Sequence, residues 1–311
     1  MSVDPDDSGS EAGGNDVSPA SSPPHGTKQK LPTTAIWPHP SIPDPSPAFL
    51  QIGSLPRLPI WHPAPFPQEY AHLETLFLCD LCLKYMPSSF VASRHKLHCV
   101  AKHPPGSEIY RDGPISIFEV DGRKSKAYCQ NLCLLAKSYL NHKTLYYDVE
   151  PFLFYVLTLA DSTGCHFAGY FSKEKTSEEA YNLSCIMTLP LYQSQGFGQL
   201  LIDLRNSKEN KLGSPEKPLS SLGLKCYDKY WAAVVFACLA DAHAGQQPLS
   251  VQDICYKTRM TKDDVLYTLA QNQWLAHTDP AEPYHFVLRS PFPANTNHRR
   301  IKRNQLHWVP F

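Results

Sequence analysis

The stretch Asn182-Leu-Ser-Cys-Ile-Met-Thr-Leu-Pro-Leu-Tyr-Gln-Ser-Gln-Gly-Phe-Gly-Gln-Leu-Leu201 predicts a strand, a loop and the start of a helix. Leu183–Leu189 is largely apolar, Pro190 ends it, and Gly196 and Gly198 precede an apolar helical face. Backbone N–H groups at a helix N-terminus lack partners and carry partial positive charge. A glycine-bearing loop at such a terminus therefore predicts a site for a phosphate or diphosphate group.

Two well-known phosphate motifs do not fit this loop. No Gly-Lys-Ser/Thr is present, and the Gly-x-Gly lacks the third glycine and the acidic residue of a dinucleotide fold. The loop Gln193–Gly198 instead resembles the Gln/Arg-x-x-Gly-x-Gly/Ala loop that grips the diphosphate of acetyl-CoA in acetyltransferases. Its flanks, Ser184-Cys-Ile186 before it and Gly213-Ser-Pro-Glu-Lys-Pro-Leu-Ser220 after it, resemble the MYST family of histone acetyltransferases.

Length and composition set the broad class. The chain has 311 residues, 42% hydrophobic content and a formal net charge of zero. It has no apolar run near the roughly 20 residues of a membrane span and no secretory leader pattern, so we expect a soluble intracellular protein without membrane contact. Its ten cysteines are then expected as thiols or metal ligands. Because the net charge is zero, any DNA contact must be local.

Four residues have the spacing of a zinc site. Cys79-Asp-Leu-Cys82 is followed after twelve residues by His95 and after three more by Cys99. The first pair is expected on a hairpin and the second pair, at i and i+4, on one face of a helix, which gives four tetrahedral ligands. His98 could replace His95 as a ligand, but no residue would then separate it from Cys99, so His95 fits the spacing better. The alternative to a zinc site is that these are four unrelated buried residues. We expect a structural zinc finger, with phosphate contact through its lysines and arginine as a lesser alternative.

Longer blocks extend the resemblance to about Leu50–Trp308. Trp61–Tyr70 resembles the segment that opens the MYST domain, and Lys102–Tyr110, Tyr128–Lys137 and His142–Tyr155 look like near-verbatim family sequence. The resemblance implies an α/β (α+β) fold of the acetyltransferase (GNAT-like) type, with a mixed central sheet, an N-terminal Cys-Cys-His-Cys zinc finger and a helical, winged-helix-like C-terminal part. The chain resembles a short form of the family, which has no chromo-barrel and no plant-homeodomain finger. The silencing-associated type of MYST protein is one candidate for this form.

Composition, motif spacing and the resemblance together divide the chain into four expected parts. The first carries ten prolines and reads as a disordered tail, with a docking peptide at Ala35-Ile-Trp-Pro38 as the alternative. The expected parts are the tail at 1–48, a zinc-finger part at 49–110, an acetyl-CoA-binding core at 111–231 and a helix-turn-helix-like part with a basic tail at 232–311.

Periodicity predicts the elements of the core. Ile115–Gly122 alternates and ends in Asp-Gly, which predicts a strand followed by a hairpin turn. Tyr128–Leu140 has helical spacing, with Cys129 and Cys133 expected in the core. Two apolar strands are expected at Phe152–Leu159 and Cys165–Ser172.

The C-terminal third predicts helices and one small β element. Helices are expected at Trp231–Ala240, after Ser250, and from Thr261 through Ala270, because a capping residue precedes the last two. A strand is expected at Tyr284–Leu288. A basic run lies near the C-terminus and consists of Arg299, Arg300, Lys302 and Arg303. Local DNA contact and a solvated tail are the two interpretations of this run.

Acetyl transfer to lysine requires a base, because an ammonium cannot attack a thioester. Glu216, held between two prolines, matches the family's catalytic glutamate; an exposed loop carboxylate is the alternative. Cys185 matches the family's active-site cysteine, either beside the reacting thioester or as an acetyl acceptor, and direct transfer is favoured. The family's self-acetylated lysine falls on Lys143, for which a solvated loop residue is the alternative.

The resemblance also assigns contacts to acetyl-CoA. They are carried by β-strand backbone groups, the glycine loop and two later side chains: Ile186, Met187, Thr188, Gln193, Ser194, Gln195, Gly196, Phe197, Gly198, Gln199, Ser220 and Lys229. Three departures qualify them. The family usually has arginine at one or both positions of Ser194 and Gln195, Lys229 replaces a serine, and the helix after Gly198 is shorter by about three residues, a little under one turn.

The resemblance therefore implies a nuclear histone lysine acetyltransferase that regulates chromatin and transcription. Its co-substrate would be acetyl-CoA and its metal structural zinc. Its partners would be histone tails, nucleosomes and scaffold subunits of a chromatin complex. Because of the missing arginines and the shortened helix, a catalytically weak chromatin-binding subunit of the same fold is the alternative.

Overall fold

A computed structural model describes residues 46–176, 181–208, 211–276, 285–286 and 299–307. These residues fall in one compact unit, Pro43–Phe311. The expected tail and its Ala35–Pro38 segment lie almost wholly outside the described residues. In the described part, no helix is both long and apolar enough to cross a membrane.

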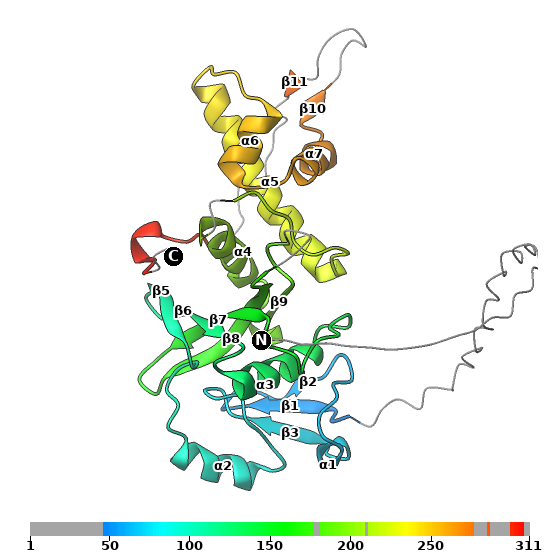
Figure 1. Cartoon of the computed structure of the whole chain (residues 1–311), viewed down its shortest axis with the longest axis vertical. Coiled ribbons are helices and arrows are strands. Elements are labelled where there is room, and N and C mark those ends of the chain that lie inside the picture. Colours follow the sequence, from blue (N-terminus) through cyan, green and yellow to red (C-terminus); the bar gives the residue numbers. More distant parts are fainter. Residues whose placement is uncertain (1–45, 177–180, 209–210, 277–284, 287–298, 308–311) are drawn as a thin grey trace, which may run out of the picture. The chain divides into compact units, whose positions relative to one another are not determined.

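Five strands form the central sheet (Figure 1), in the order β5-β6-β7-β8-β9. They are β5 Ser107–Asp112, β6 Ile115–Asp121, β7 Phe152–Ala160, β8 Cys165–Glu174 and β9 Cys185–Thr188. Each pairing between them is antiparallel. The α+β fold class is confirmed, but the central sheet is not mixed as expected, because consecutive neighbouring strands reverse direction.

Parallel pairing occurs instead in a smaller N-terminal sheet, with the order β2-β1-β3-β4. Its strands are β1 Phe49–Ile52, β2 Leu58–Pro59, β3 Thr75–Leu78 and β4 Tyr85–Met86. β1 pairs parallel with β3, and the two other pairings are antiparallel. The short helix α1 Gln68–Ala71 precedes β3, and α2 Ser89–His98 follows β4.

The two faces of the central sheet pack against different helices. Along β7, Phe154 and Val156 join the core that contains α3 Lys126–Lys137, whereas Tyr155 and Leu157 join the core that contains α4 Phe197–Lys208. This division follows from the period of two along a strand. The α3 core also includes β1 and β3 of the N-terminal sheet. Both faces of the sheet are thus covered (Figure 1).

The hairpin expected at Asp121-Gly122 is wrong, and the preceding Asp-Gly pair makes the turn instead. Gly113 has φ +58° and open space around it, and it joins β5 to β6. At the second pair, Asp121 accepts a bond from the backbone N–H of Arg123 at 2.8 Å, and the chain continues into α3. A Cβ on Gly122 would lie 1.9 Å from the carbonyl oxygen of Val149, so this glycine permits close packing.

The expected C-terminal helices are present, and the first is longer than expected. It is α5 Ser221–Ala244, which crosses the expected boundary at 231, and α6 Val251–Thr258 and α7 Lys262–Gln271 pack against it. Ser250 and Asp253 form a capping box, and Thr261 caps α7. A two-stranded element follows, β10 Leu275–Ala276 with β11 His285–Phe286, so only the centre of the strand expected at Tyr284–Leu288 is described.

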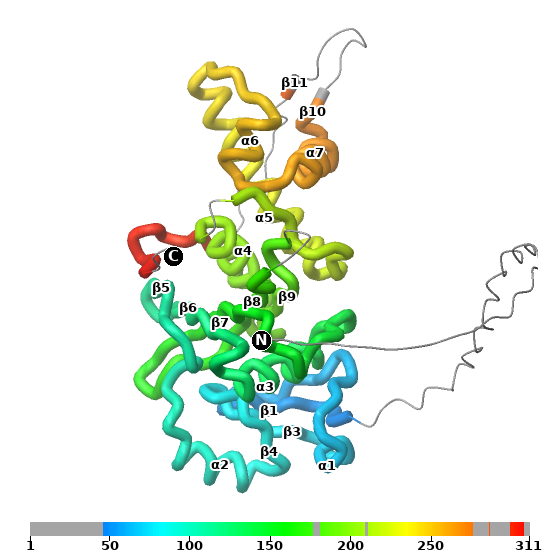
Figure 2. The backbone as a smooth tube through the Cα atoms, in the orientation of Figure 1, coloured from blue at the N-terminus to red at the C-terminus, as the bar shows by residue number. Residues whose placement is uncertain are grey.

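The basic run near the C-terminus is neither a free tail nor separate from the core. Residues 299–307 include the 3₁₀ turn η2 Arg303–Gln305 and run beside β5 (Figure 2). Leu306 forms a bridge with Tyr110, and the N–H of His307 donates to the carbonyl of Ile109 at 2.9 Å. The expectation of a solvated tail is therefore wrong for the backbone of these residues, whereas the side chains of the four basic residues are exposed.

Candidate functional site

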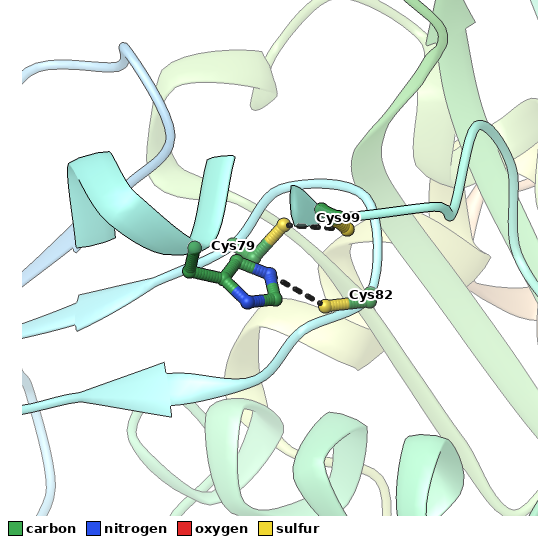
Figure 3. Close-up of side chains that lie close together, drawn as sticks. Cys79, Cys82 and Cys99 are labelled. Carbon is green, nitrogen blue, oxygen red and sulfur yellow. Dashed lines mark hydrogen bonds between the residues drawn. The ribbon is translucent and has the colours of Figure 1, made fainter. Parts of the chain in front are cut away.

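The four expected zinc ligands come together in the structure. Cys79 and Cys82 lie in the turn between β3 and β4, and Cys99 ends α2 (Figure 3). His95 lies on α2. One ligand atom from each residue lies within 4.8 Å of the others. Nε2 of His95 is 3.2 Å from Sγ of Cys82, so the ring faces the sulfur atoms.

Three thiols and an imidazole at close range, of which Cys79 is buried and the others are half-buried, suit tetrahedral zinc. His98 is not in this group, as the spacing favoured. Cys129 and Cys133, the other i and i+4 pair, are buried in the α3 core as predicted. The zinc site is structural in character because all four positions are filled by protein ligands, which leaves none for a substrate.

The glycine loop follows β9 through the 3₁₀ turn η1 Pro190–Tyr192 and ends at α4. Ser194 has φ +59° and Gly196 has φ +84°, so the loop passes twice through the left-handed region. The N–H of Leu200 bonds to the carbonyl of Gly196 at 3.0 Å and makes the first turn of the helix. Helix geometry leaves the preceding N–H groups without partners in the helix, as an anion site requires.

The two glycines serve different purposes. Gly196 takes a backbone conformation that other residues adopt with strain. Gly198 lies in α4, where a Cβ would be 2.9 Å from Sγ of Cys226 on α5. The first glycine shapes the loop, and the second lets α4 approach α5 closely.

Cys185 is half-buried on β9 and faces a lysine. Nζ of Lys143 donates toward Sγ of Cys185 at 3.7 Å, and Lys143 is only 8% exposed. The interpretation of Lys143 as a solvated loop residue is therefore wrong. Burial raises the pKa of the nearby Cys133 thiol, while Lys143 opposes that increase.

The loop that carries Glu216 is fastened beside the start of β9. The N–H of Glu216 donates to the carbonyl of Leu183 at 2.9 Å, two residues before Cys185. Nζ of Lys217 forms an ion pair with the buried Asp264 at 2.9 Å, which ties the loop to α7. The side chain of Glu216 itself is exposed. The sequence did not indicate the link from Lys217 to Asp264.

The other expected cofactor residues lie in two groups. Ile186, Met187 and Thr188 are on β9, which is the last strand in the sheet order, so one backbone edge faces no described strand. On α5, Ser220 is the N-cap and accepts from the N–H of Gly223 at 3.1 Å, while Lys229 is exposed.

Within the loop, burial separates the expected contacts. The exposed side chains are those of Ser194 and Gln195, and the buried ones are those of Phe197 and Gln199. Gln193 reaches back to the carbonyl of Thr188 at 3.4 Å, which links the loop to β9.

Sequence reasoning missed one neighbour of this loop. Nε of Arg299 donates to the carbonyl of Gln195 at 2.9 Å, although 104 positions separate the two residues. The basic run was the only signal that could have indicated it.

Comparison with known proteins shows the family of the chain. The family model described as the MOZ/SAS family matches residues 103–307, and the MYST family zinc finger domain matches residues 47–99. The chain is similar to the histone acetyltransferase ESA1 of Mycosarcoma maydis, with 45% identity over 268 residues, which cover 84% of this chain and 46% of that protein.

Two further relatives bear the same activity in their names. The histone acetyltransferase mst2 of Schizosaccharomyces pombe is 47% identical over 274 residues, 85% of this chain and 66% of the relative. The histone acetyltransferase KAT6B of Homo sapiens is 51% identical over 226 residues, 72% of this chain and 11% of the relative. The chain thus spans less than two thirds of the length of each of these relatives. The two family matches together nevertheless cover most of this chain. The chain belongs to the MOZ/SAS family and carries the MYST zinc finger.

Proposed function

We propose that this protein is a histone lysine acetyltransferase that moves the acetyl group of acetyl-CoA to the ε-amine of lysines in core histone tails. The observation that carries the proposal is the continuous unit of β9, glycine loop and α4 in a chain of the MOZ/SAS family. Cys185 lies on this strand, and the loop that we propose for the diphosphate follows it.

The proposed reaction is a direct transfer. The neutral amine of the histone lysine attacks the thioester carbonyl, the carbon–sulfur bond breaks, and coenzyme A leaves as the thiolate and takes a proton. Glu216 is the proposed base that accepts the amine proton, through water, because its loop is fastened next to β9. Cys185 lies beside the reacting centre in this proposal and does not form a covalent bond.

The proposed contacts to acetyl-CoA follow the unit in order. The edge of β9 at Ile186–Thr188 that faces no described strand pairs with the amide groups of the pantetheine arm, because an edge strand offers backbone groups for pairing. The loop Gln193–Gln199 binds the diphosphate through N–H groups. Ser220 and Lys229, at the start of α5 and on its exposed side, make the remaining contacts.

A catalytically weak chromatin-binding subunit is the second candidate. The exposed carboxylate of Glu216 favours it, since a general base works best in an apolar setting from which water is excluded. The two candidates share their nuclear location, their histone partners and their scaffold subunits as proposals. They differ only in turnover.

The deciding experiment is acetyl transfer from labelled acetyl-CoA to purified nucleosomes and to free core histones. An enzyme transfers label that depends on protein concentration and disappears in Glu216→Gln. A weak subunit binds nucleosomes to the same extent but transfers label no faster than the Glu216→Gln control. In the same assay, added scaffold subunits would show whether turnover depends on partners.

A further inference from the structure

The basic C-terminal segment 299–307 is fastened to the catalytic core by charged contacts. The carboxylate of Asp203, on α4, accepts from the N–H of Ile301 at 2.8 Å and from Nη1 of Arg300 at 3.1 Å. Nζ of Lys302 is 2.8 Å from Asp112 at the end of β5. The side chain of Ile301 is buried in the α4 core. These contacts fix the position of the residue that begins the segment.

That residue, Arg299, lies at the glycine loop. Its Nε donates to the carbonyl of Gln195 at 2.9 Å, and its Cζ is 4.6 Å from the ring centre of Phe197. Phe197 is the first residue of α4 and is buried. The guanidinium is therefore held between the loop and the start of the helix by one hydrogen bond and one cation–π contact.

The glycine loop contains no charged residue of its own. Gln193–Gln199 offers backbone N–H groups and the partial charge of the helix N-terminus to a diphosphate. A diphosphate carries full negative charges, for which a guanidinium is the matching side chain because its planar fork meets phosphate oxygens in pairs. Arg299 brings this missing positive charge from the far end of the chain.

We propose that Arg299 is a binding residue for the diphosphate of acetyl-CoA and replaces a cation that the loop lacks. This inference rests on the proposed function, since it assumes that acetyl-CoA occupies the loop. A guanidinium has five N–H donors, and the bond to Gln195 uses one of them. The same bond engages a loop carbonyl that would otherwise repel an anion.

A purely structural role is the competing explanation: Arg299 would hold the segment against the loop and would never contact the ligand. The two explanations differ in what they predict for ligand affinity and for salt. A charge that contacts the diphosphate makes binding weaken as ionic strength rises, whereas a structural clamp does not.

The test compares Arg299→Gln with Arg303→Gln by calorimetry, using coenzyme A, 3′-dephospho-coenzyme A and pantetheine. Arg303 is the matched control because it is on the same segment but lines a separate hollow with Asp203 and Lys257. We expect Arg299→Gln to weaken both coenzyme A and its 3′-dephospho form about 10- to 100-fold, the loss of one charge-assisted bond. Pantetheine, which lacks the diphosphate, should bind Arg299→Gln and wild type equally, and Arg303→Gln should bind coenzyme A like wild type.

The outcomes are separable. Unchanged affinity of Arg299→Gln for coenzyme A, beside a wild type that binds it, would overturn this inference and leave the proposed function intact. Weakening for coenzyme A but not for the 3′-dephospho form would move the contact to the 3′-phosphate and overturn the diphosphate assignment. A wild type that binds no coenzyme A would contradict the proposed function itself. Arg299→Lys keeps the charge without the fork, and we expect it to recover part of the affinity and most of the salt dependence, which a change of folding would not produce.

Discussion

Nζ of Lys143 lies 3.7 Å from Sγ of Cys185, and these two residues belong to a loop and a strand 42 positions apart. The lysine is 8% exposed. An ammonium in such a place is costly unless it is compensated, and a thiol compensates it poorly. Acetylation of Lys143 would remove the charge and leave a neutral side chain next to Cys185.

We therefore expect Lys143 to become acetylated when the purified chain is incubated with acetyl-CoA. Because Lys143 is buried beside its own Cys185, the transfer should take place within one molecule. Mass spectrometry should show a first-order rate that does not change over a tenfold range of protein concentration. The exposed Lys126 serves as the control for spontaneous acetylation. A rate that rises with protein concentration would show transfer between molecules and contradict the expectation.

A second prediction concerns Gly196. Gly196→Glu should abolish the binding of acetyl-CoA, because the side chain both fills the loop and adds a negative charge to an anion site. Gly113→Glu is the matched control: Gly113 also has positive φ, but it lies in a hairpin turn with nothing within 4 Å of its added Cβ. Both variants should lose about 1 kcal/mol of stability or more through backbone strain. Calorimetric titration should show binding in Gly113→Glu only, and equal affinities would refute the loop assignment.

A third prediction concerns the metal. We expect about one zinc ion per chain, and Cys82→Ser should lower zinc content and thermal stability together, because a structural zinc site contributes its binding energy to folding. Cys238→Ser, at a half-buried cysteine on α5 outside the ligand group, should keep its zinc. Elemental analysis and thermal unfolding provide the two measurements. A Cys82→Ser protein with full zinc content would exclude this residue as a ligand.

The parts of the site that are local in sequence could be predicted from it. The spacing from Cys79 to Cys99 indicated the zinc ligands because a hairpin turn and one helical turn have fixed geometry. Ser250 and Thr261 were correct helix starts because a cap acts on N–H groups only two or three residues away.

The parts that depend on tertiary packing could not be predicted. Two Asp-Gly pairs have equal turn chemistry, but only the first joins two neighbouring strands, while the second packs Gly122 against Val149 and leads into a helix. The burial of Lys143 and the bond from Arg299 to Gln195 join segments that are distant along the chain. No periodicity or motif encodes such pairs.

A fourth prediction concerns pH. His166 lies between Asp80, 2.6 Å away in the zinc-binding turn, and Asp161, 2.9 Å away. Burial alone would lower the pKa of His166, but the hydrogen bonds to Asp161 and Asp80 outweigh it, so the pKa is raised. Hydrogen bonds from Thr163 and His166 hold the pKa of Asp161 well below its usual range, so Asp161 stays ionised across the pH range in which His166 titrates.

Because the pKa of His166 is higher in the folded than in the unfolded chain, its protonated form stabilises the fold. This contribution is complete below the pKa of the unfolded chain, about 6.5, and is lost as pH rises through the pKa of the folded chain. His166→Gln should thus lose on the order of 1 kcal/mol of stability at pH 6 and less at pH 9. Urea unfolding of both proteins at the two pH values measures the difference, in which zinc-linked effects common to both cancel. A loss that is larger at pH 9 would contradict the sign.

The last prediction concerns the roles of Glu216 and Cys185. Glu216→Gln keeps the shape of the side chain but cannot accept a proton, so turnover on histones should fall roughly 10²- to 10⁴-fold at neutral pH while acetyl-CoA binding survives. The loss should shrink as pH rises, because more of the substrate amine is then neutral without help from a base. Cys185→Ala should cost much less if transfer is direct, and its pH–rate profile should keep the shape of the wild type. The pair of profiles is decisive because only the loss of a base should shrink as pH rises, whereas the loss of a residue beside the thioester should leave the shape of the profile unchanged. If Glu216→Gln works at a near-normal rate at neutral pH and Cys185→Ala is inactive, the reaction proceeds through an acetyl-cysteine, in which the sulfur first takes the acetyl group from acetyl-CoA and the lysine then attacks that thioester with another base.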